Sequence, residues 1–210
     1  MSRDRMDVAG RYLVNTSDLD EAAAALACSY SPMRIFADTE ATANPWVRIW
    51  RTRVGPMTLD DAEISSGIRY EMAAPQGVLL CRVRAGTVDF SIGEHVASFG
   101  RGDLVAVVAD GIAMAGTLRQ ARLDLITFHR ALWGEVTAQH GDRRFIHPLS
   151  RFAAPVNPSA GQQVVDVIDH IRKFVANNPL VAREPLVAGS AARYLAATML
   201  TAFPSAGFTV

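Results

Sequence analysis

The sequence lacks the features that define several large classes of protein. Its 210 residues contain only two cysteines, Cys28 and Cys81, and each is expected to be a small buried side chain rather than half of a disulfide. The charged N-terminal segment has no apolar core, so no secretory signal is expected, and no run approaches the ~18 apolar residues that span a bilayer. These absences indicate a cytoplasmic protein with no membrane partner.

An excess of positive charge is also missing. The chain has 21 basic and 21 acidic residues, and its formal net charge is zero. Proteins that bind nucleic acid directly usually carry a basic stripe, because contacts to phosphates supply much of their affinity. Here the arginines are scattered, and the densest group, Arg48, Arg51 and Arg53, lies within one predicted strand. The composition therefore gives no sign that this chain binds DNA by itself.

The middle of the chain, residues 47–129, has the pattern of a small β domain. It follows an alanine-rich helix predicted over Leu19–Cys28 and a loop that ends near Pro45. Short apolar or alternating stretches are separated by glycine-containing turns, which is typical of a sandwich or a barrel. The predicted strands are 47–54, 67–72, 78–84, 88–92, 104–108 and 123–128.

The last part of the chain, residues 130–210, is predicted to be helical. A short helix over Leu132–His140 and a proline-containing loop come first. Apolar residues then recur at helical spacing over 164–175, and a final helix is expected between the prolines at 185 and 204. That final helix carries apolar residues on more than one side, so we expect it to pack against two surfaces at once.

Two apolar stripes on these helices predict a dimer interface. The first stripe is Val164, Ile168, Ile171 and Val175, and the second is Tyr194, Leu195, Met199 and Leu200. An apolar surface at the end of a chain must be covered, and pairing with a twofold copy is the commonest solution. The alternative is that both stripes pack on the β domain of the same chain.

Three features, taken in their order along the chain, resemble a known family. They are the helix that opens after Asn15–Asp20, the strand series with turns at Gly86 and Phe99–Leu104, and the closing helix that ends in Phe203-Pro204. Over roughly residues 10–208 the chain is similar to the effector-binding and dimerisation domain of AraC/XylS-family bacterial transcription regulators, of the cupin-related type.

The resemblance implies an α+β fold. A cupin-like (double-stranded β-helix) barrel with an N-terminal helix, residues 1–129, would sense a small-molecule effector, and antiparallel helices, residues 130–210, would join two subunits into a homodimer. It implies a regulator rather than an enzyme, meeting DNA only through C-terminal helix-turn-helix units. The chain ends at Val210 without such units, so we expect a fragment of a longer regulator, with a truncated relative as the alternative.

A metal-dependent cupin enzyme is the competing interpretation. Such an enzyme needs two histidines one residue apart, a carboxylate and a later histidine, which together place ligands on neighbouring strands. Counting from Gly86, the first two positions hold Ile92 and Glu94. His95 and His129 are the histidines that this alternative would have to use. No metal or other cofactor is therefore expected.

A pocket is the remaining candidate for function. The predicted ligand-binding residues are Trp50, Tyr70, Arg82, Arg84, Phe90 and His129. Aromatic rings can stack on a planar effector, and a buried guanidinium can hold a carboxylate. Strand alternation places Leu79, Cys81 and Val83 opposite the two arginines. If that apolar set packs outward, the arginines line the pocket; the favoured alternative is that it forms the core and the arginines are solvated.

Overall fold

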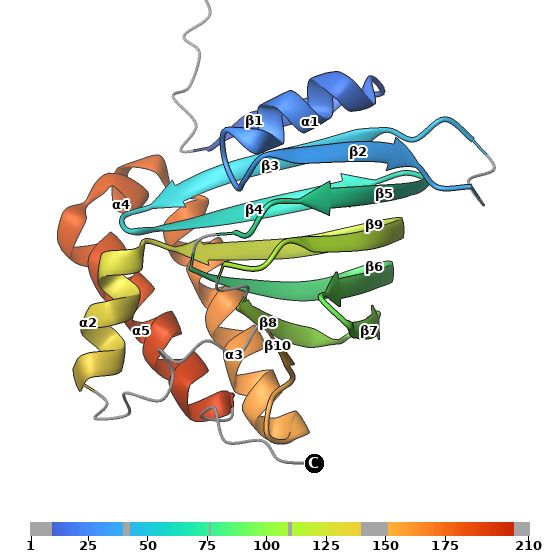
Figure 1. Ribbon diagram of the computed structural model, residues 1–210. Helices are drawn as coiled ribbons and strands as arrows, with labels where there is room; N and C mark the ends of the chain where they lie inside the picture. Colours follow the sequence, from blue (N-terminus) through green and yellow to red (C-terminus); the bar gives the residue numbers. More distant parts are fainter. Residues whose placement is uncertain (1–9, 40–42, 76, 109–110, 140–150, 204–210) are drawn as a thin grey trace, which may run out of the picture.

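Ten strands and five α-helices make up the described part of the chain, which covers residues 10–39, 43–75, 77–108, 111–139 and 151–203 of the computed structural model (Figure 1). The strands are β1 (Gly10–Thr16), β2 (Met33–Ala37), β3 (Val47–Val54), β4 (Met57–Ile64), β5 (Gly67–Met72), β6 (Val78–Ile92), β7 (His95–Gly100), β8 (Leu104–Val108), β9 (Met114–Phe128) and β10 (Arg151–Ala153). The helices are α1 (Leu19–Ala27), α2 (Arg130–Gln139), α3 (Pro158–Ile171), α4 (Pro179–Arg183) and α5 (Pro185–Ala202), with a π-helical segment η2 (Arg172–Ala176) that continues α3.

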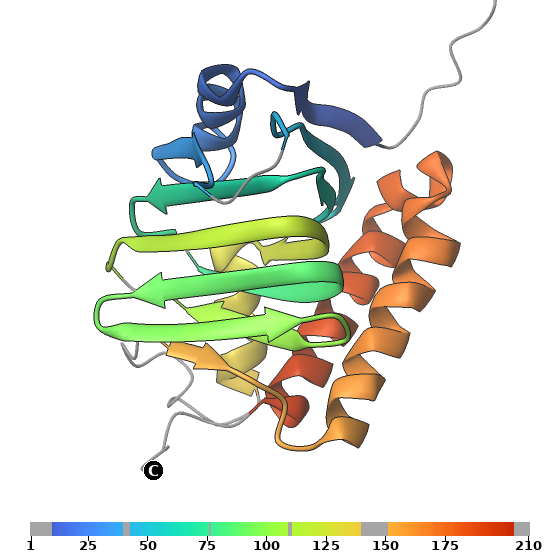
Figure 2. The same cartoon turned by 90° about the vertical axis from the view of Figure 1, so that its right-hand side faces the viewer.

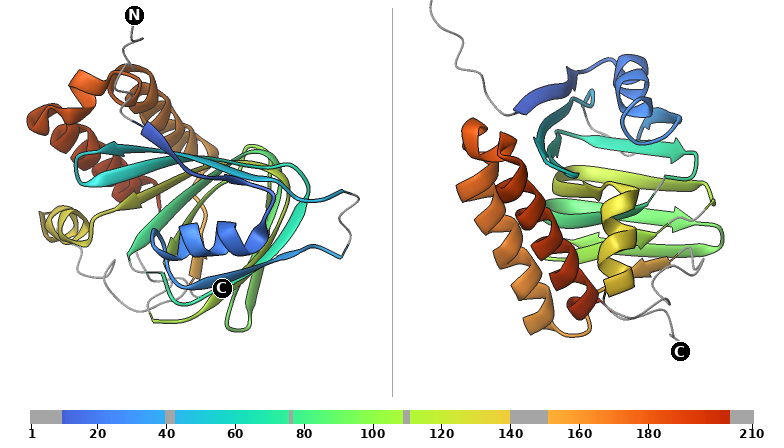
Figure 3. Two further views of the ribbon diagram at one scale, coloured as in Figure 1. Left: turned by 90° about the horizontal axis from the view of Figure 1, so that it is seen from above. Right: turned by 90° about the vertical axis from the view of Figure 1, so that its left-hand side faces the viewer.

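The strands form one sheet of 10 strands in the order β1-β3-β4-β9-β6-β8-β10, with β5 attached to β9, β2 attached to β5 and β7 attached to β6. Its centre is the antiparallel pair β6 and β9, each 15 residues long. The sheet curls strongly about this pair (Figures 2 and 3). It therefore has a concave inner face and a convex outer face.

A paired bulge in the two long strands decides which residues face inward. Gly86 and Gln120 both have positive φ angles, and the β6–β9 register shifts beside them. A Cβ atom at Gly86 would lie 2.3 Å from the carbonyl oxygen of Arg119, so glycine is required there. Along β6 the inward side chains therefore change from odd to even positions, as Val83 and Val88 illustrate. Gly86, predicted as a turn between two strands, lies within the single strand β6 instead.

Helix α1 covers the inner face of the sheet. The Asp18 side chain caps its first turn by accepting hydrogen bonds from the backbone N–H groups of Asp20 and Glu21. Ala22 and Leu26 are buried in the same core as the inward side chains of the strands. In Figure 3 the helix lies across the concave side of the sheet. The inner face is thus closed by an element that precedes most of the strands in the chain.

The C-terminal helices cover the outer face, in a second core. Outward side chains of the sheet, such as Leu80, Ile126 and Phe128, pack there with residues of α2, α3 and α5. Helices α3 and α5 lie side by side and antiparallel (Figure 3). Pro204, the predicted end of the last helix, lies outside the described residues. None of the helices in the described ranges is long and apolar enough to cross a membrane.

Candidate functional site

An apolar cavity lies between α1 and the concave face of the sheet, and we call it the inner cavity. Its volume is about 90 Å³. Its wall contains aliphatic, methionine and aromatic side chains, and none of its lining residues is charged. The lining residues are Leu26, Tyr30, Met33, Ile35, Val47, Ile49, Ala62, Ile64, Ile68, Tyr70, Met72, Leu79, Phe90, Met114, Leu118, Leu123 and Leu125. A molecule bound here would contact mainly apolar surface.

Tyr30, in the wall of this cavity, contacts two further polar side chains, Arg51 and Asp60, and the three form the inner polar cluster. Asp60 is fully buried, and it faces Arg51 across the β3–β4 pair. The Arg51 Nε and Nη2 atoms donate to the two carboxylate oxygens of Asp60 at 2.8 and 2.5 Å. The Tyr30 hydroxyl donates to Asp60 Oδ2, and the Arg51 guanidinium lies 5.1 Å from the Tyr30 ring centroid. The two opposite charges neutralise one another inside the fold.

The electrostatics of the inner polar cluster follow from this geometry. Burial raises the pKa of Tyr30 well above its ordinary value, and the negative charge of Asp60 adds to that effect. Burial alone would lower the pKa of Arg51, but the hydrogen bonds and the charge of Asp60 outweigh it and raise that pKa. At neutral pH Tyr30 is therefore a neutral phenol and Arg51 is charged.

A second and larger space, the outer pocket, adjoins the inner cavity. Its volume is about 420 Å³, and it lies at the β3–β4 turn, the start of β6 and the end of β9. Three side chains, Tyr30, Met72 and Leu79, line both spaces. Arg53 and His129 line the outer pocket. The outer pocket has the size of a small-molecule site, which spans roughly 300–1,000 Å³, whereas the inner cavity is much smaller.

The structure divides the predicted ligand-binding residues among different places. Tyr70 and Phe90 line the inner cavity, and His129 lines the outer pocket. Trp50 lies on the outer face of β3, where its ring packs edge-on against Tyr12 with centroids 4.7 Å apart. These positions bring two of the aromatic side chains together at one cavity and leave the third outside it.

Arg82 and Arg84 do not reach either space. Leu79, Cys81 and Val83 are buried in the inner core, so alternation along β6 turns the arginines toward the outer face. The prediction that these arginines bind a ligand inside the barrel is corrected by this orientation. The favoured alternative placed Leu79, Cys81 and Val83 in the core, and it predicts correctly that the two arginines point away from that core. The arginines are nevertheless not simply solvated, because both are held by carboxylates.

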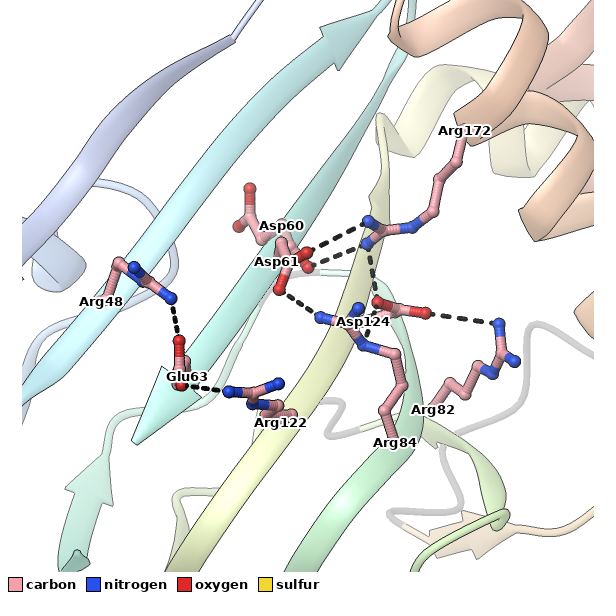
Figure 4. Close-up of polar contacts among 9 residues, drawn as sticks. All are labelled: Arg48, Asp60, Asp61, Glu63, Arg82, Arg84, Arg122, Asp124 and Arg172. Atoms are coloured by element: carbon pink, nitrogen blue, oxygen red, sulfur yellow. Dashed lines mark hydrogen bonds and ion pairs between the residues drawn. The ribbon is translucent and has the colours of Figure 1, made fainter. Parts of the chain in front are cut away.

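Between the outer face and the end of α3 lies a second charged group, the outer polar cluster, which Figure 4 shows in part. Its members are Asp61, Arg82, Arg84, Asp124, Asp169 and Arg172. The three positive and three negative side chains balance one another. The cluster thus joins strands β4, β6 and β9 to α3 and η2 by charge.

Asp124 is the centre of the outer polar cluster. It is almost fully buried and lies directly opposite Asp61 in the β4–β9 register, where two like charges repel. Arg84 Nε and Arg172 Nη2 approach its Oδ1 at 2.9 and 2.8 Å, and Arg82 Nη1 lies 3.6 Å from its Oδ2. Neither carboxylate oxygen of Asp124 has a well-directed hydrogen bond within the described residues. Burial raises the pKa of Asp124, although the arginines oppose the shift.

The two polar clusters meet at neighbouring residues of β4. Asp60 accepts hydrogen bonds from Arg51 on the inner face. Asp61 points the other way, toward Arg84 and Arg172 (Figure 4). Arg172 also donates to the backbone carbonyl oxygen of Asp60 at 3.5 Å. A displacement of β4 at this point would therefore act on both faces of the sheet.

Tyr30, Asp60 and Arg172 belong to the site but were not predicted from the sequence. A signal was present in the segment Met57–Ile64, where two adjacent aspartates interrupt an apolar alternation. Alternation sends such neighbours to opposite faces, so one of them has to be buried with a partner. Arg51 was noticed only as part of a local concentration of arginines.

The predicted dimer interface is largely buried within the chain itself. Seven of its eight residues belong to the outer-face core, and Tyr194 alone is exposed, at 59%. The buried residues are Val164, Ile168, Ile171, Val175, Leu195, Met199 and Leu200. A side chain already covered by its own sheet has no surface left for a second copy. This corrects the assignment of those seven residues to an interface.

His95 and His129 lie far apart in the structure. His95 opens β7 beside the start of β9, because Ile92 pairs with both His95 and Met114. His129 follows the other end of β9, and its Nδ1 accepts the backbone N–H of Ala131. Among the described residues, no three histidine, cysteine or acidic side chains gather where they could hold a metal ion. The arrangement does not support a metal centre built on this pair.

No family model matches the sequence, and no curated protein matches it. Among solved structures, the chain is similar to the AraC-like transcriptional activator CuxR, with a TM-score of 0.68 and 10% sequence identity over 93% of this chain and 71% of that one. At this identity the likeness establishes the fold, and it confirms the predicted α+β, cupin-like architecture with C-terminal helices.

Weaker likenesses cover smaller parts of the chain. A cupin-like protein from Thermotoga maritima matches 45% of this chain and 76% of its own, with a TM-score of 0.33 and 16% identity. A mutant of the oxalate decarboxylase OxdC from Bacillus subtilis matches 51% of this chain and 36% of its own, with a TM-score of 0.35 and 14% identity. Neither is close enough to decide between a regulator and an enzyme.

Proposed function

We propose that this chain is the effector-sensing and dimerisation domain of an AraC-type bacterial transcription regulator. In this proposal the cavity binds a small-molecule effector, and the helices carry the signal to helix-turn-helix units that bind DNA. The domain works in the cytoplasm and has no catalytic role. The observation that carries the proposal is the pair of polar clusters on β4, which links the cavity wall to the C-terminal helices.

The physical basis is a shift between two arrangements of the helices. Effector binding next to the inner polar cluster would move Asp60, and with it Asp61 and the contacts of Arg172. The ion pairs of Asp124 can adapt to such a movement, because they are close contacts without strict hydrogen-bond geometry. An effector that favours one position of η2 then changes the population of helix arrangements.

The methionines of the chain provide a direct test. Met33, Met72 and Met114 line the inner cavity, whereas Met199 is buried among the helices on the other side of the sheet. We expect a small molecule found by screening to shift the methyl NMR signals of the cavity methionines and also that of Met199. A ligand that shifts the cavity signals and leaves Met199 unchanged would contradict signalling through the helices.

Arg172→Leu tests the route of this coupling. It removes the contacts to Asp61 and Asp124, so the Met199 response should shrink while the Met114 response persists. Lys173→Leu, at the exposed next position, is the matched control and should leave both responses intact.

The proposed dimer uses side chains that the chain leaves uncovered. Phe174, Leu180, Leu186, Val187 and Tyr194 are exposed apolar or aromatic residues of η2, α4 and α5. Exposed apolar side chains gathered on neighbouring elements are typical of a protein interface. Leu186→Glu should therefore convert a dimer into a monomer in light scattering, and a wild-type chain that is already monomeric at high micromolar concentration would contradict dimerisation.

A further inference from the structure

The inner cavity must enlarge before it can hold a typical effector. At about 90 Å³ it is well below the size of small-molecule sites, and the outer pocket lies directly beside it. Tyr30, Met72 and Leu79 form the wall between the two spaces. Met72 and Leu79 belong to paired strands, whereas Tyr30 lies in the connection between α1 and β2. Tyr30 is therefore the part of this wall that can move without breaking the sheet.

Moving Tyr30 has a chemical consequence. Its hydroxyl is the donor to Asp60 Oδ2, and Asp60 is fully buried. A buried acceptor that loses its donor is destabilised, more so when it is charged. Asp60 Oδ2 keeps the hydrogen bond from Arg51 Nη2, and a donor from water or from a ligand restores the one that Tyr30 made. Because Arg51 already neutralises Asp60 through two hydrogen bonds, a neutral donor suits the place that the Tyr30 hydroxyl leaves, and Arg51 has no free positive charge for an anion there.

We propose that Tyr30 is a displaceable wall residue, and that the effector is an uncharged molecule with an apolar body and a hydroxyl group that replaces Tyr30 as the donor to Asp60. This inference rests on the proposed function and specifies its ligand. It differs from the anionic effector that the sequence suggested, because the arginines expected to hold a carboxylate lie on the outer face.

The test compares two probes of nearly equal shape, 4-fluorophenol and 4-fluorotoluene, by ¹⁹F NMR titration of the full chain. Transfer from water favours the methyl compound, so a preference for the hydroxyl compound requires a polar partner in the protein. We expect 4-fluorophenol to bind about tenfold more tightly than 4-fluorotoluene, the order of magnitude of one unmade buried hydrogen bond. Equal binding, tighter binding of 4-fluorotoluene, or binding of neither probe overturns the inference.

Tyr30→Phe identifies the residue involved. Without its hydroxyl, the side chain no longer competes for Asp60, so 4-fluorophenol should bind at least about threefold more tightly than to the wild type. The control is Tyr12→Phe, an exposed tyrosine on β1, which should change nothing. Unchanged affinity in Tyr30→Phe, with the fold verified by circular dichroism, contradicts displacement of Tyr30. The wild-type comparison of the two probes remains decisive if this variant does not fold.

The methyl signals separate this inference from the proposed function. If 4-fluorophenol is preferred but the Met199 signal does not respond, the ligand class is supported and signalling to the helices is not. If 4-fluorotoluene binds equally well and shifts Met199, the sensor proposal stands and the role of Asp60 as the recognition point is rejected.

Discussion

Two adjacent aspartates on β4 have opposite surroundings. Asp60 faces inward and has a directed hydrogen bond to each carboxylate oxygen from Arg51, with a further one from Tyr30. Asp61 faces outward, opposite a second buried carboxylate, and shares Arg84 and Arg172 with it. The inner polar cluster is small and fully hydrogen-bonded, whereas the outer polar cluster is larger, balanced in charge and less strictly directed.

This difference separates rigidity from adaptability. A buried ion pair with bidentate geometry fixes its partners, because any other position leaves a charge without a partner. A group of several charges at close range can exchange partners with little change in energy. The Arg51–Asp60 pair therefore holds β3 and β4 together as one unit beside the cavity, and the outer polar cluster allows the helices to shift relative to the sheet.

The largest expected effect comes from breaking the inner polar cluster. Arg51→Met leaves Asp60 buried without a positive partner, and we expect a loss of about 3–5 kcal/mol in the free energy of unfolding, measured with urea. Arg53→Met, at an exposed position of the same strand, should cost less than about 0.5 kcal/mol. Arg51→Met combined with Asp60→Leu should recover most of the loss, because an apolar pair needs no neutralisation. A loss below about 1 kcal/mol in the single variant would show that Asp60 is not charged or not dry.

A smaller loss in the free energy of unfolding is expected when the outer polar cluster is changed. Arg172→Leu leaves Asp124 with Arg82 and Arg84, so we expect about 1–3 kcal/mol, less than for Arg51→Met. Hydrogen exchange should localise the change to α3 and η2, with the inner core unaffected. An equal loss in the two variants would remove the distinction between a rigid and an adaptable cluster.

The fold was largely predictable from the sequence, and the errors in that prediction have physical causes. Short apolar or alternating stretches identified β3, β5 and β8, and the alanine-rich composition identified α1. The strand β4 was missed because Asp60 and Asp61 interrupt its pattern. Gly86 was read as a turn, since a local glycine signal does not tell a bulge from a strand end. Strands β1 and β2 obtain much of their definition from distant partners, β3 and β5.

The site was less predictable, because it depends on which face of each strand is covered. Tyr70 and Phe90 were assigned to the pocket from their aromatic character, and they do line the inner cavity. The same reasoning failed for Trp50, whose neighbour Ile49 lines the cavity instead. Helix stripes such as Val164–Ile171 show only that a surface is buried. Whether its own sheet or a second chain covers it is decided by tertiary packing.

The smallest expected effect is a pH dependence of stability that arises from Glu63 and its two partners, Arg48 and Arg122. Burial works to raise the pKa of Glu63, but hydrogen bonds and charges from Arg122 and Arg48 outweigh it and lower that pKa below 4.5. The stabilisation is therefore present above the unfolded pKa and is lost as the pH falls through the lower folded value. Both arginines are well exposed, so the effect should be a fraction of 1 kcal/mol.

In urea unfolding, Glu63→Gln should be slightly less stable than the wild type at about pH 6 and equal to it at about pH 3. Glu71→Gln, an exposed position on β5, should show no such convergence. If the difference in the free energy of unfolding between the wild type and Glu63→Gln grew as the pH fell, its sign would be wrong for a paired carboxylate. That result would show that Arg48 and Arg122 do not hold Glu63.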